Sequence, residues 1–176
     1  MPSSDELIYL GIDPGLGTTG YGVLRFEGKH PVLLDAGVIR SVAGDPLPER
    51  LEELYGGALE IMEKYRPQTM GIEKLYAHYK HPATAIKMAH ARGVLCLAAV
   101  QMKVRSVQLP STRIKKLVTG NGRASKEQVS GMVRHLLGIS GEIRPDDVTD
   151  ALAAAIAAYE SDRNAGKYQR HDRKNG

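Results

Sequence analysis

A chain of 176 residues is long enough for one domain with a buried core, and no apolar run reaches the ~20 residues of a membrane span. The single cysteine, Cys96, excludes a disulfide framework and a thiolate metal site, so any metal chemistry must use oxygen ligands. We interpret Cys96 as a buried filler of the core. The acidic opening at residues 1–6 is unlike a signal peptide, so we expect a cytoplasmic protein without membrane contact.

The formal net charge of +4 is small, but it is unevenly distributed. Residues 113–134 carry six basic residues against one acidic residue, and residues 161–176 carry five against two. Two basic stretches in an otherwise acidic chain indicate a polyanionic partner, although a single lysine is more often an ordinary solvated charge.

The pattern of apolar residues predicts three strands, followed by helices that alternate with two more strands. The strands lie at residues 7–13, 20–27, 32–40, 69–73 and 104–109, and the helices at residues 45–65, 82–102, 110–120, 125–138 and 145–159. We therefore predict an α/β fold with a mixed five-stranded sheet flanked by helices, in one domain of residues 1–160. The polar, basic tail of residues 161–176 is predicted to be disordered.

The most informative stretch is residues 10–23, which contains Asp13 directly after an apolar strand. Pro14 and Gly15 end that strand, which leaves the carboxylate at its carboxyl end, where sites form in open sheets. Glycines at positions 15, 17, 20 and 22 leave room for a metal ion or a phosphate to approach the backbone. The alternative is that Asp13 simply caps a tight turn.

Three further acidic residues follow a similar logic. Glu73 ends a short apolar strand, and Asp147 and Asp150 lie three residues apart on one face of a helix. A solvated strand end and a preference of acids for helix amino ends are the alternative explanations. If Asp13 and these three residues converge, their mutual repulsion would make some of them take up protons unless cations are bound. Two Mg²⁺ or Mn²⁺ ions would suit an all-oxygen site and phosphodiester hydrolysis.

The helix predicted at residues 82–102 is apolar on more than one face. Its small residues would let a second helix approach closely: Ala83, Ala85, Ala89, Ala91 and Gly93. A two-fold homodimer through this helix would place two acidic sites on one side of the assembly. The alternative is a fully enclosed core helix.

Several segments together resemble the RuvC family of Holliday-junction resolvases. They are Gly-Ile-Asp-Pro-Gly with Thr-Gly-Tyr-Gly-Val, Ile72-Glu73, Ala91-Arg-Gly-Val94, Lys126 with Gln128-Val129, Met132-Val-Arg134, and Asp147-x-x-Asp150-Ala-Leu-Ala. The resemblance implies a ribonuclease-H-like fold, a homodimer, and Mg²⁺- or Mn²⁺-dependent nicking of opposed strands in four-way junction DNA. It also implies that Asp13, Glu73, Asp147 and Asp150 are the catalytic acids, with Asp147 chosen over its neighbour Asp146. Collaboration with the RuvA and RuvB branch-migration proteins is a further implication.

For DNA contact, the resemblance points to Tyr76 against the bases at the junction centre and to Lys115 and Lys126 near the scissile phosphate. Lys116 and Arg123 lie in the same basic stretch, so we add them as candidate phosphate contacts. Tyr76 would stack on an unpaired base, or else fold onto the core. We interpret His78 and His81 as hydrogen-bond donors rather than metal ligands, because the oxygen site is already complete.

Two other functions share some of these features. The motif at Asp13 also resembles the phosphate loop of sugar kinases and Hsp70-like ATPases, which need two such domains around a nucleotide, whereas this chain has one. A junction-binding module without catalysis would gain from losing negative charge beside phosphate, so four acids argue against it. Cleavage with a divalent cation, compared with ATP hydrolysis, would separate the three functions.

Overall fold

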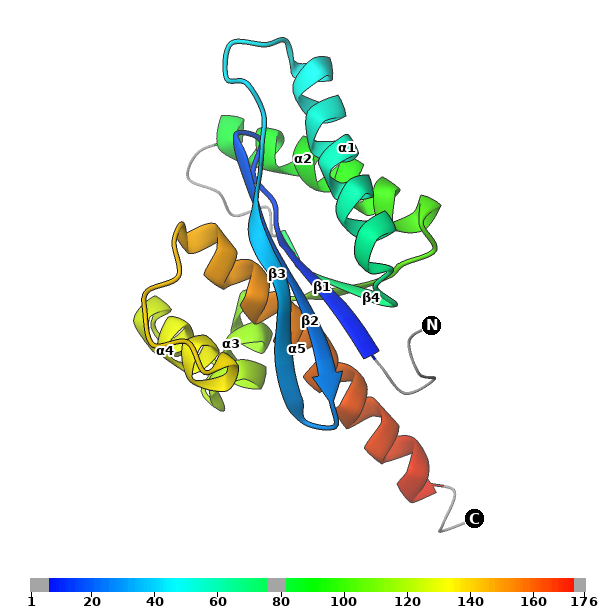
Figure 1. Ribbon diagram of the computed structural model, residues 1–176, viewed down its shortest axis with the longest axis vertical. Coiled ribbons are helices and arrows are strands. Elements are labelled where there is room, and N and C mark those ends of the chain that lie inside the picture. Colours follow the sequence, from blue (N-terminus) through cyan, green and yellow to red (C-terminus); the bar gives the residue numbers. More distant parts are fainter. Residues whose placement is uncertain (1–6, 76–81, 173–176) are drawn as a thin grey trace.

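The computed structural model describes residues 7–75 and 82–172, with side chains as far as residue 166. Five strands form one mixed sheet in the order β3-β2-β1-β4-β5 (Figure 1). β1, β2 and β3 pair antiparallel, whereas β4 and β5 continue the sheet parallel to β1. The elements are β1 Leu7–Asp13, β2 Thr18–Glu27, β3 His30–Arg40, α1 Leu47–Tyr65, β4 Thr69–Glu73, α2 Pro82–Gln101, β5 Arg105–Leu109, α3 Ser111–Thr119, α4 Lys126–Leu137 and α5 Asp146–Asp172. The predicted mixed five-stranded sheet is confirmed.

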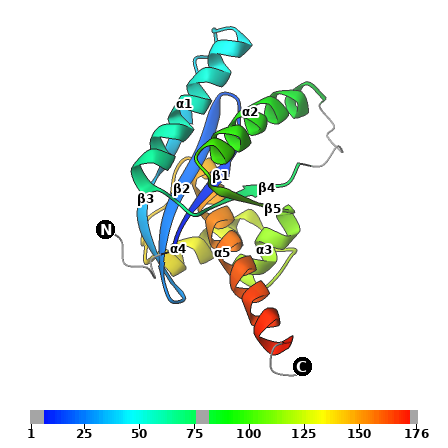
Figure 2. The ribbon, with the colours of Figure 1, turned by 90° about the vertical axis from the view of Figure 1, so that its right-hand side faces the viewer.

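Helices cover both faces of the sheet, and the two faces have separate cores. α1 and α2 cover one face, and α3, α4 and α5 cover the other (Figure 2). On the α1–α2 face, Leu10, Ile12 and Ile72 pack with Leu54 and other large apolar residues. The alternation of the strands sends Asp13 and Glu73, which follow Ile12 and Ile72, toward the α5 face.

A row of glycines lets α5 lie unusually close to the sheet. Gly11 is paired with Gly22 on one side and with Gly71 on the other. A Cβ atom added at Gly11 or Gly71 would collide with the α5 backbone, at Ala151 and at Ala154. Gly22 and Gly20, which we expected to make room for a metal ion or a phosphate, instead lie against Leu152 and Asp147 of α5. The prediction that these two glycines make room for a ligand was therefore wrong. They make room for α5.

The last helix is longer than the sequence pattern predicts. α5 continues past Tyr159 to Asp172, so the chain from residue 161 to residue 172 is helical and not disordered as predicted. Asp162 explains part of the extension, because it accepts a hydrogen bond of 2.8 Å from the Tyr9 hydroxyl and pairs with Arg105. Both partners belong to strands far away in the sequence, and local patterning does not reveal such contacts.

α2 buries one side and exposes another. Ala91, Leu95, Ala98 and Ala99 are buried, whereas Ile86, Leu97 and Val100 are 57%, 51% and 71% exposed. The alternative of a fully enclosed helix is therefore wrong. Within the described residues α2 is the one helix long and apolar enough to cross a membrane, a test that core helices of soluble proteins also pass. Cys96, expected to be buried, is half-buried beside this core.

Candidate active site

Two of the predicted acids end neighbouring parallel strands. Ile12 of β1 is paired with Ile72 of β4, so the next residues, Asp13 and Glu73, leave the sheet side by side. The turn that follows Asp13 is held by Thr19, whose hydroxyl donates to the Gly15 carbonyl at 2.8 Å and accepts from the Gly15 amide at 3.2 Å. Thr19 thus supplies the turn-stabilising bonds that the alternative interpretation assigned to Asp13.

The other two acids reach the same region from the first turns of α5. Gly20, the pairing partner of Asp13 in β2, lies directly against the Asp147 backbone. Asp150 follows one turn later and lines a pocket together with Asp13 and Glu73. The glycine row therefore sets the distance between the carboxylates of the strands and those of the helix.

Electrostatics show that the four carboxylates interact. Burial raises the pKa of Asp13 to about 7, reinforced by the negative charges of Asp150, Asp147 and Glu73, while Lys126 acts in the opposite direction. The pKa of Glu73 is also raised, first by burial and then by Asp150, against Lys115 and Lys126. An acid that holds its proton to neutral pH indicates a buried site in which nearby cations do not fully offset the negative charge.

The pocket around these acids has a volume of about 260 Å³ and a mixed lining. Lys115 of α3 and Lys126 of α4 line it together with Asp13 and Glu73, and Ile12, Ile114 and Val129 form part of its wall. Lys126 Nζ lies 3.5 Å from Asp150 Oδ2. The pocket thus combines carboxylates with cations, as expected where a negatively charged phosphate must approach acidic groups.

The donor chemistry fits a hard divalent cation, because all four acidic side chains offer oxygen ligands. Among the described residues, however, no three acidic, histidine or cysteine side chains form a ready metal-binding cluster. The carboxylates surround one region but stand apart in this conformation, in line with the mutual repulsion that adds to burial in raising the pKa of Asp13. A bound divalent cation would offset that repulsion.

The remaining predicted DNA contacts lie further from the pocket. Lys116 and Arg123 are exposed, on α3 and on the turn before α4, and neither lines the pocket of Asp13. The backbone of Arg123 is fixed by a hydrogen bond of 2.9 Å from its amide to Asn121 Oδ1. Tyr76, His78 and His81 lie outside the described residues, so their roles stay predictions.

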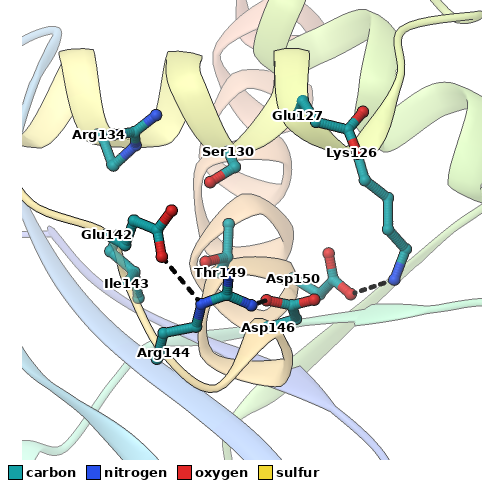
Figure 3. Close-up of a pocket in the computed structure, with 10 residues that line it drawn as sticks. All are labelled: Lys126, Glu127, Ser130, Arg134, Glu142, Ile143, Arg144, Asp146, Thr149 and Asp150. Carbon is teal, nitrogen blue, oxygen red and sulfur yellow. Dashed lines mark hydrogen bonds and ion pairs between the residues drawn. The ribbon is translucent and has the colours of Figure 1, made fainter.

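A second pocket, of about 210 Å³, adjoins the first and shares Lys126 and Asp150 with it (Figure 3). Arg144 lies between Glu142 and Asp146 and pairs with both, at 3.2 and 2.8 Å. Asp146 is therefore paired with a cation, whereas its neighbour Asp147 acts on Asp13. The sequence analysis did not identify this pocket, although Arg144 lies two residues before Asp146 in the chain.

Comparison with known proteins gives a consistent family. The family model described as crossover junction endodeoxyribonuclease RuvC matches residues 9–158. A relative of that name from Rhodopirellula baltica is 46% identical over 158 residues, covering 90% of this chain and 88% of the relative. One from Pelotomaculum thermopropionicum is 39% identical over 150 residues, covering 85% and 91%.

Solved structures agree with this family. The structure described as T. thermophilus RuvC in complex with Holliday junction substrate superposes with a TM-score of 0.86 at 30% identity, covering 90% of this chain and 96% of that one. The yeast mitochondrial resolvase Ydc2 has a TM-score of 0.67 at 14% identity, covering 94% and 85%, and so shows the fold alone. The ribonuclease-H-like fold is thereby confirmed, and the nuclease is favoured over the kinase-like alternative. The chain belongs to the RuvC family of crossover junction endodeoxyribonucleases.

Proposed function

We propose that this chain resolves four-way DNA junctions at the pocket around Asp13, where Asp13, Glu73, Asp147 and Asp150 hold two Mg²⁺ or Mn²⁺ ions. The family supplies the reaction class, a metal-dependent endodeoxyribonuclease of recombination and repair. The observation that carries the assignment of residues is the buried position of Asp13, whose pKa of about 7 is raised first by burial and then by the charges of Asp150, Asp147 and Glu73. Bound ions would activate a water molecule and stabilise the leaving oxygen.

The protein groups then have separate tasks. Asp13 and Glu73, fixed at the ends of two paired strands, form one side of the site, and the first turns of α5 form the other. Lys115 and Lys126 line the same pocket and would hold the phosphate of the cleaved strand beside the acids. Lys116, Arg123 and Tyr76 would extend the contact along the junction, the cations to phosphates and the aromatic ring to a base.

The paired cuts that resolve a junction need two such sites. The exposed apolar side of α2, with Ile86, Leu97 and Val100, supports a homodimer of this chain through that helix. Cooperation with the RuvA and RuvB branch-migration proteins, and a location in the cytoplasm, complete the proposed function.

Replacement of Asp13, Glu73, Asp147 or Asp150 by its amide tests the site. Each variant should lose nicking of a synthetic four-way junction in Mg²⁺ or Mn²⁺ while junction binding persists, because the amide removes charge but little volume. Asp146→Asn is the matched control, since Asp146 lies on the same turn but pairs with Arg144. A variant of the four that still cuts at the wild-type rate would remove that residue from the site.

The DNA contacts are tested by the dependence of junction affinity on salt. Each lysine that touches a phosphate contributes about 0.9 to the slope of log affinity against log salt. Lys115→Ala and Lys126→Ala should each reduce this slope, whereas Lys29→Ala, exposed in the hairpin between β2 and β3, should leave it unchanged. An unaltered slope in Lys115→Ala would mean that Lys115 does not contact phosphate.

A further inference from the structure

Arg92 of α2 reaches the end of the strand that carries Glu73. Its Nε donates a hydrogen bond of 3.3 Å to the Glu73 backbone carbonyl. We propose that Arg92 is a positioning residue that orients the Glu73 carboxylate from the opposite face of the sheet. The inference rests on the proposed function, in which Glu73 is one of the four acids.

The geometry fixes the peptide bond that follows Glu73 on both sides. Its carbonyl accepts from Arg92, and its amide, that of Lys74, donates to the Leu109 carbonyl of β5 at 2.9 Å. β4 ends at Glu73, so these two hydrogen bonds hold the chain at the point where it leaves the sheet. Holding the carbonyl restricts rotation about the Cα–C bond of Glu73. It therefore limits the orientations that the end of β4 and the Glu73 side chain can adopt.

Arg92 acts on Glu73 through the backbone and not through charge. The groups that move the pKa of Glu73, besides burial, are Asp150, Lys115 and Lys126, and Arg92 is not one of them. A guanidinium placed to neutralise the carboxylate would lower that pKa. The contact at the carbonyl is therefore the way in which Arg92 affects the site.

Among the described residues, the contacts of Arg92 give the fold little net stability. Its Nη2 atom is buried and has no hydrogen-bond partner among the described residues. Burying an unpaired donor costs free energy, and this cost offsets the hydrogen bond that Nε makes to the Glu73 carbonyl. The neighbouring Ala91 and Leu95, both fully buried, anchor this part of α2 without its help.

The consequence is a site assembled from both faces of the sheet. α5 supplies Asp147 and Asp150 on one face, and α2 holds the backbone of Glu73 from the other. Outer groups that orient a metal ligand change metal affinity or activity about 10- to 100-fold when they are removed. We expect Arg92 to fall within this range.

The test compares Arg92→Leu and Arg92→Lys with the wild-type chain, with exposed Lys87→Leu on the same helix as the control. Arg92→Leu should bind Mn²⁺ about 10- to 100-fold more weakly in calorimetry without DNA, and its kcat for junction nicking should fall by a similar factor. KM for the junction and the midpoint of thermal unfolding should stay at wild-type values. Arg92→Lys, which keeps a donor, should recover part of the Mn²⁺ affinity, and Lys87→Leu should match the wild type.

A local readout accompanies the binding data. In Arg92→Leu the nitrogen chemical shift of the Lys74 amide should change, because that amide shares a peptide bond with the released carbonyl. Wild-type Mn²⁺ affinity and kcat in Arg92→Leu would overturn the inference, as would a rise in KM with unchanged kcat, which would make Arg92 a DNA contact. If the wild-type chain itself neither binds Mn²⁺ nor nicks the junction, the proposed function fails instead.

Discussion

The α5 face of the sheet presents glycines where the α1–α2 face presents large apolar side chains. Gly11, Gly22 and Gly71 form a row beneath α5, so that backbone lies against backbone. On the other face Leu10 and Ile12 fill the space between the sheet and the helices α1 and α2 with side chains. Side chains can adopt new rotamers when a neighbour changes, whereas backbone in contact with backbone has little freedom to move.

This difference matches what each face contributes. The α5 face carries the carboxylates, whose mutual distances must be reproducible within fractions of an ångström for metal-assisted chemistry. The α1–α2 face buries much of the large apolar surface, which is the main source of folding free energy. We therefore expect substitutions on the α5 face to affect activity and stability together, and substitutions beneath α1 to affect stability alone.

The largest effect is expected at the centre of the glycine row. Gly11→Ala would place a Cβ against the Ala151 carbonyl and within 2.7 Å of the Ala155 amide nitrogen, so α5 must shift. We expect a loss of about 4 kcal/mol in unfolding free energy, beyond the usual cost of overpacking, and loss of nicking by the folded fraction. Urea unfolding and junction cleavage measure both quantities.

Two other glycines give a graded control for Gly11. A Cβ at Gly22 would meet mainly the Leu152 side chain, which can rotate, so Gly22→Ala should cost less. Apart from its own turn of α1, Gly56 has no described atom within 4 Å of an added Cβ, and Gly56→Ala should stabilise by about 0.5–1 kcal/mol through helix propensity. If all three variants had similar stability, close backbone contact would not be what holds α5 in place.

The next effect separates stability from activity on the opposite face. Leu54 of α1 is fully buried, so Leu54→Ala should lower the unfolding free energy by about 3 kcal/mol through lost burial and a cavity. Because α1 carries none of the four acids, cleavage per folded molecule should stay near the wild-type rate at low temperature. A cleavage rate that falls as far as in Gly11→Ala would erase the distinction between the two faces.

Much of the fold could be predicted from the sequence because its strands and helices have clear apolar patterns. The helix predicted from residue 125 begins there as α4, and both hydrogen bonds of a capping box between Ser125 and Gln128 are present at its start. The role of the glycines was misinterpreted because only those after Asp13 were considered. The sequence pattern that indicates close packing of a helix lies before the acids, since Gly-Ile-Asp ends β1 and Gly-Ile-Glu ends β4.

The features missed by the sequence analysis depend on partners distant in the chain. Asp162 extends α5 by contacts with Tyr9 and Arg105, which no local pattern around residue 162 indicates. Arg92 belongs to a segment that resembles the family, yet its hydrogen bond to the Glu73 carbonyl depends on how α2 lies on the sheet. Sequence indicates which residue types are available, whereas packing decides which of them meet.

A third prediction concerns the cost of gathering acids on the α5 face. The pKa of Asp13 is about 7 in the folded chain, against an ordinary value of 3.8. Between pH 4 and pH 7 the folded chain keeps a proton that the unfolded chain releases, so stability falls as pH rises through this range and levels off above it. Asp13→Asn lacks this loss and should be more stable than the wild type at pH 8 by on the order of 2 kcal/mol, but not at pH 4.

Thermal unfolding in EDTA at pH 4, 6 and 8 measures this difference between Asp13→Asn and the wild type. Adding Mn²⁺ at pH 8 should raise the unfolding midpoint of the wild type and have much less effect on Asp13→Asn, because the cation replaces the proton as the partner of the ionised acid. Equal pH dependence of stability in the two proteins would show that the pKa of Asp13 is not raised in the folded chain.

The smallest effect tests whether a cation on the α5 face depends on its helix cap. Ser125 Oγ accepts from the Gln128 amide at 3.2 Å, and the Ser125 amide donates to Gln128 Oε1 at 2.9 Å, immediately before Lys126. Ser125→Ala should cost about 1 kcal/mol of unfolding free energy. Gln128→Glu, which retains an acceptor at the same position, should cost less.

Because Lys126 follows the cap directly, fraying of this turn should weaken junction binding slightly in Ser125→Ala and not in Gln128→Glu. Equal binding in both variants would mean that Lys126 is positioned by its contact with Asp150 rather than by the cap.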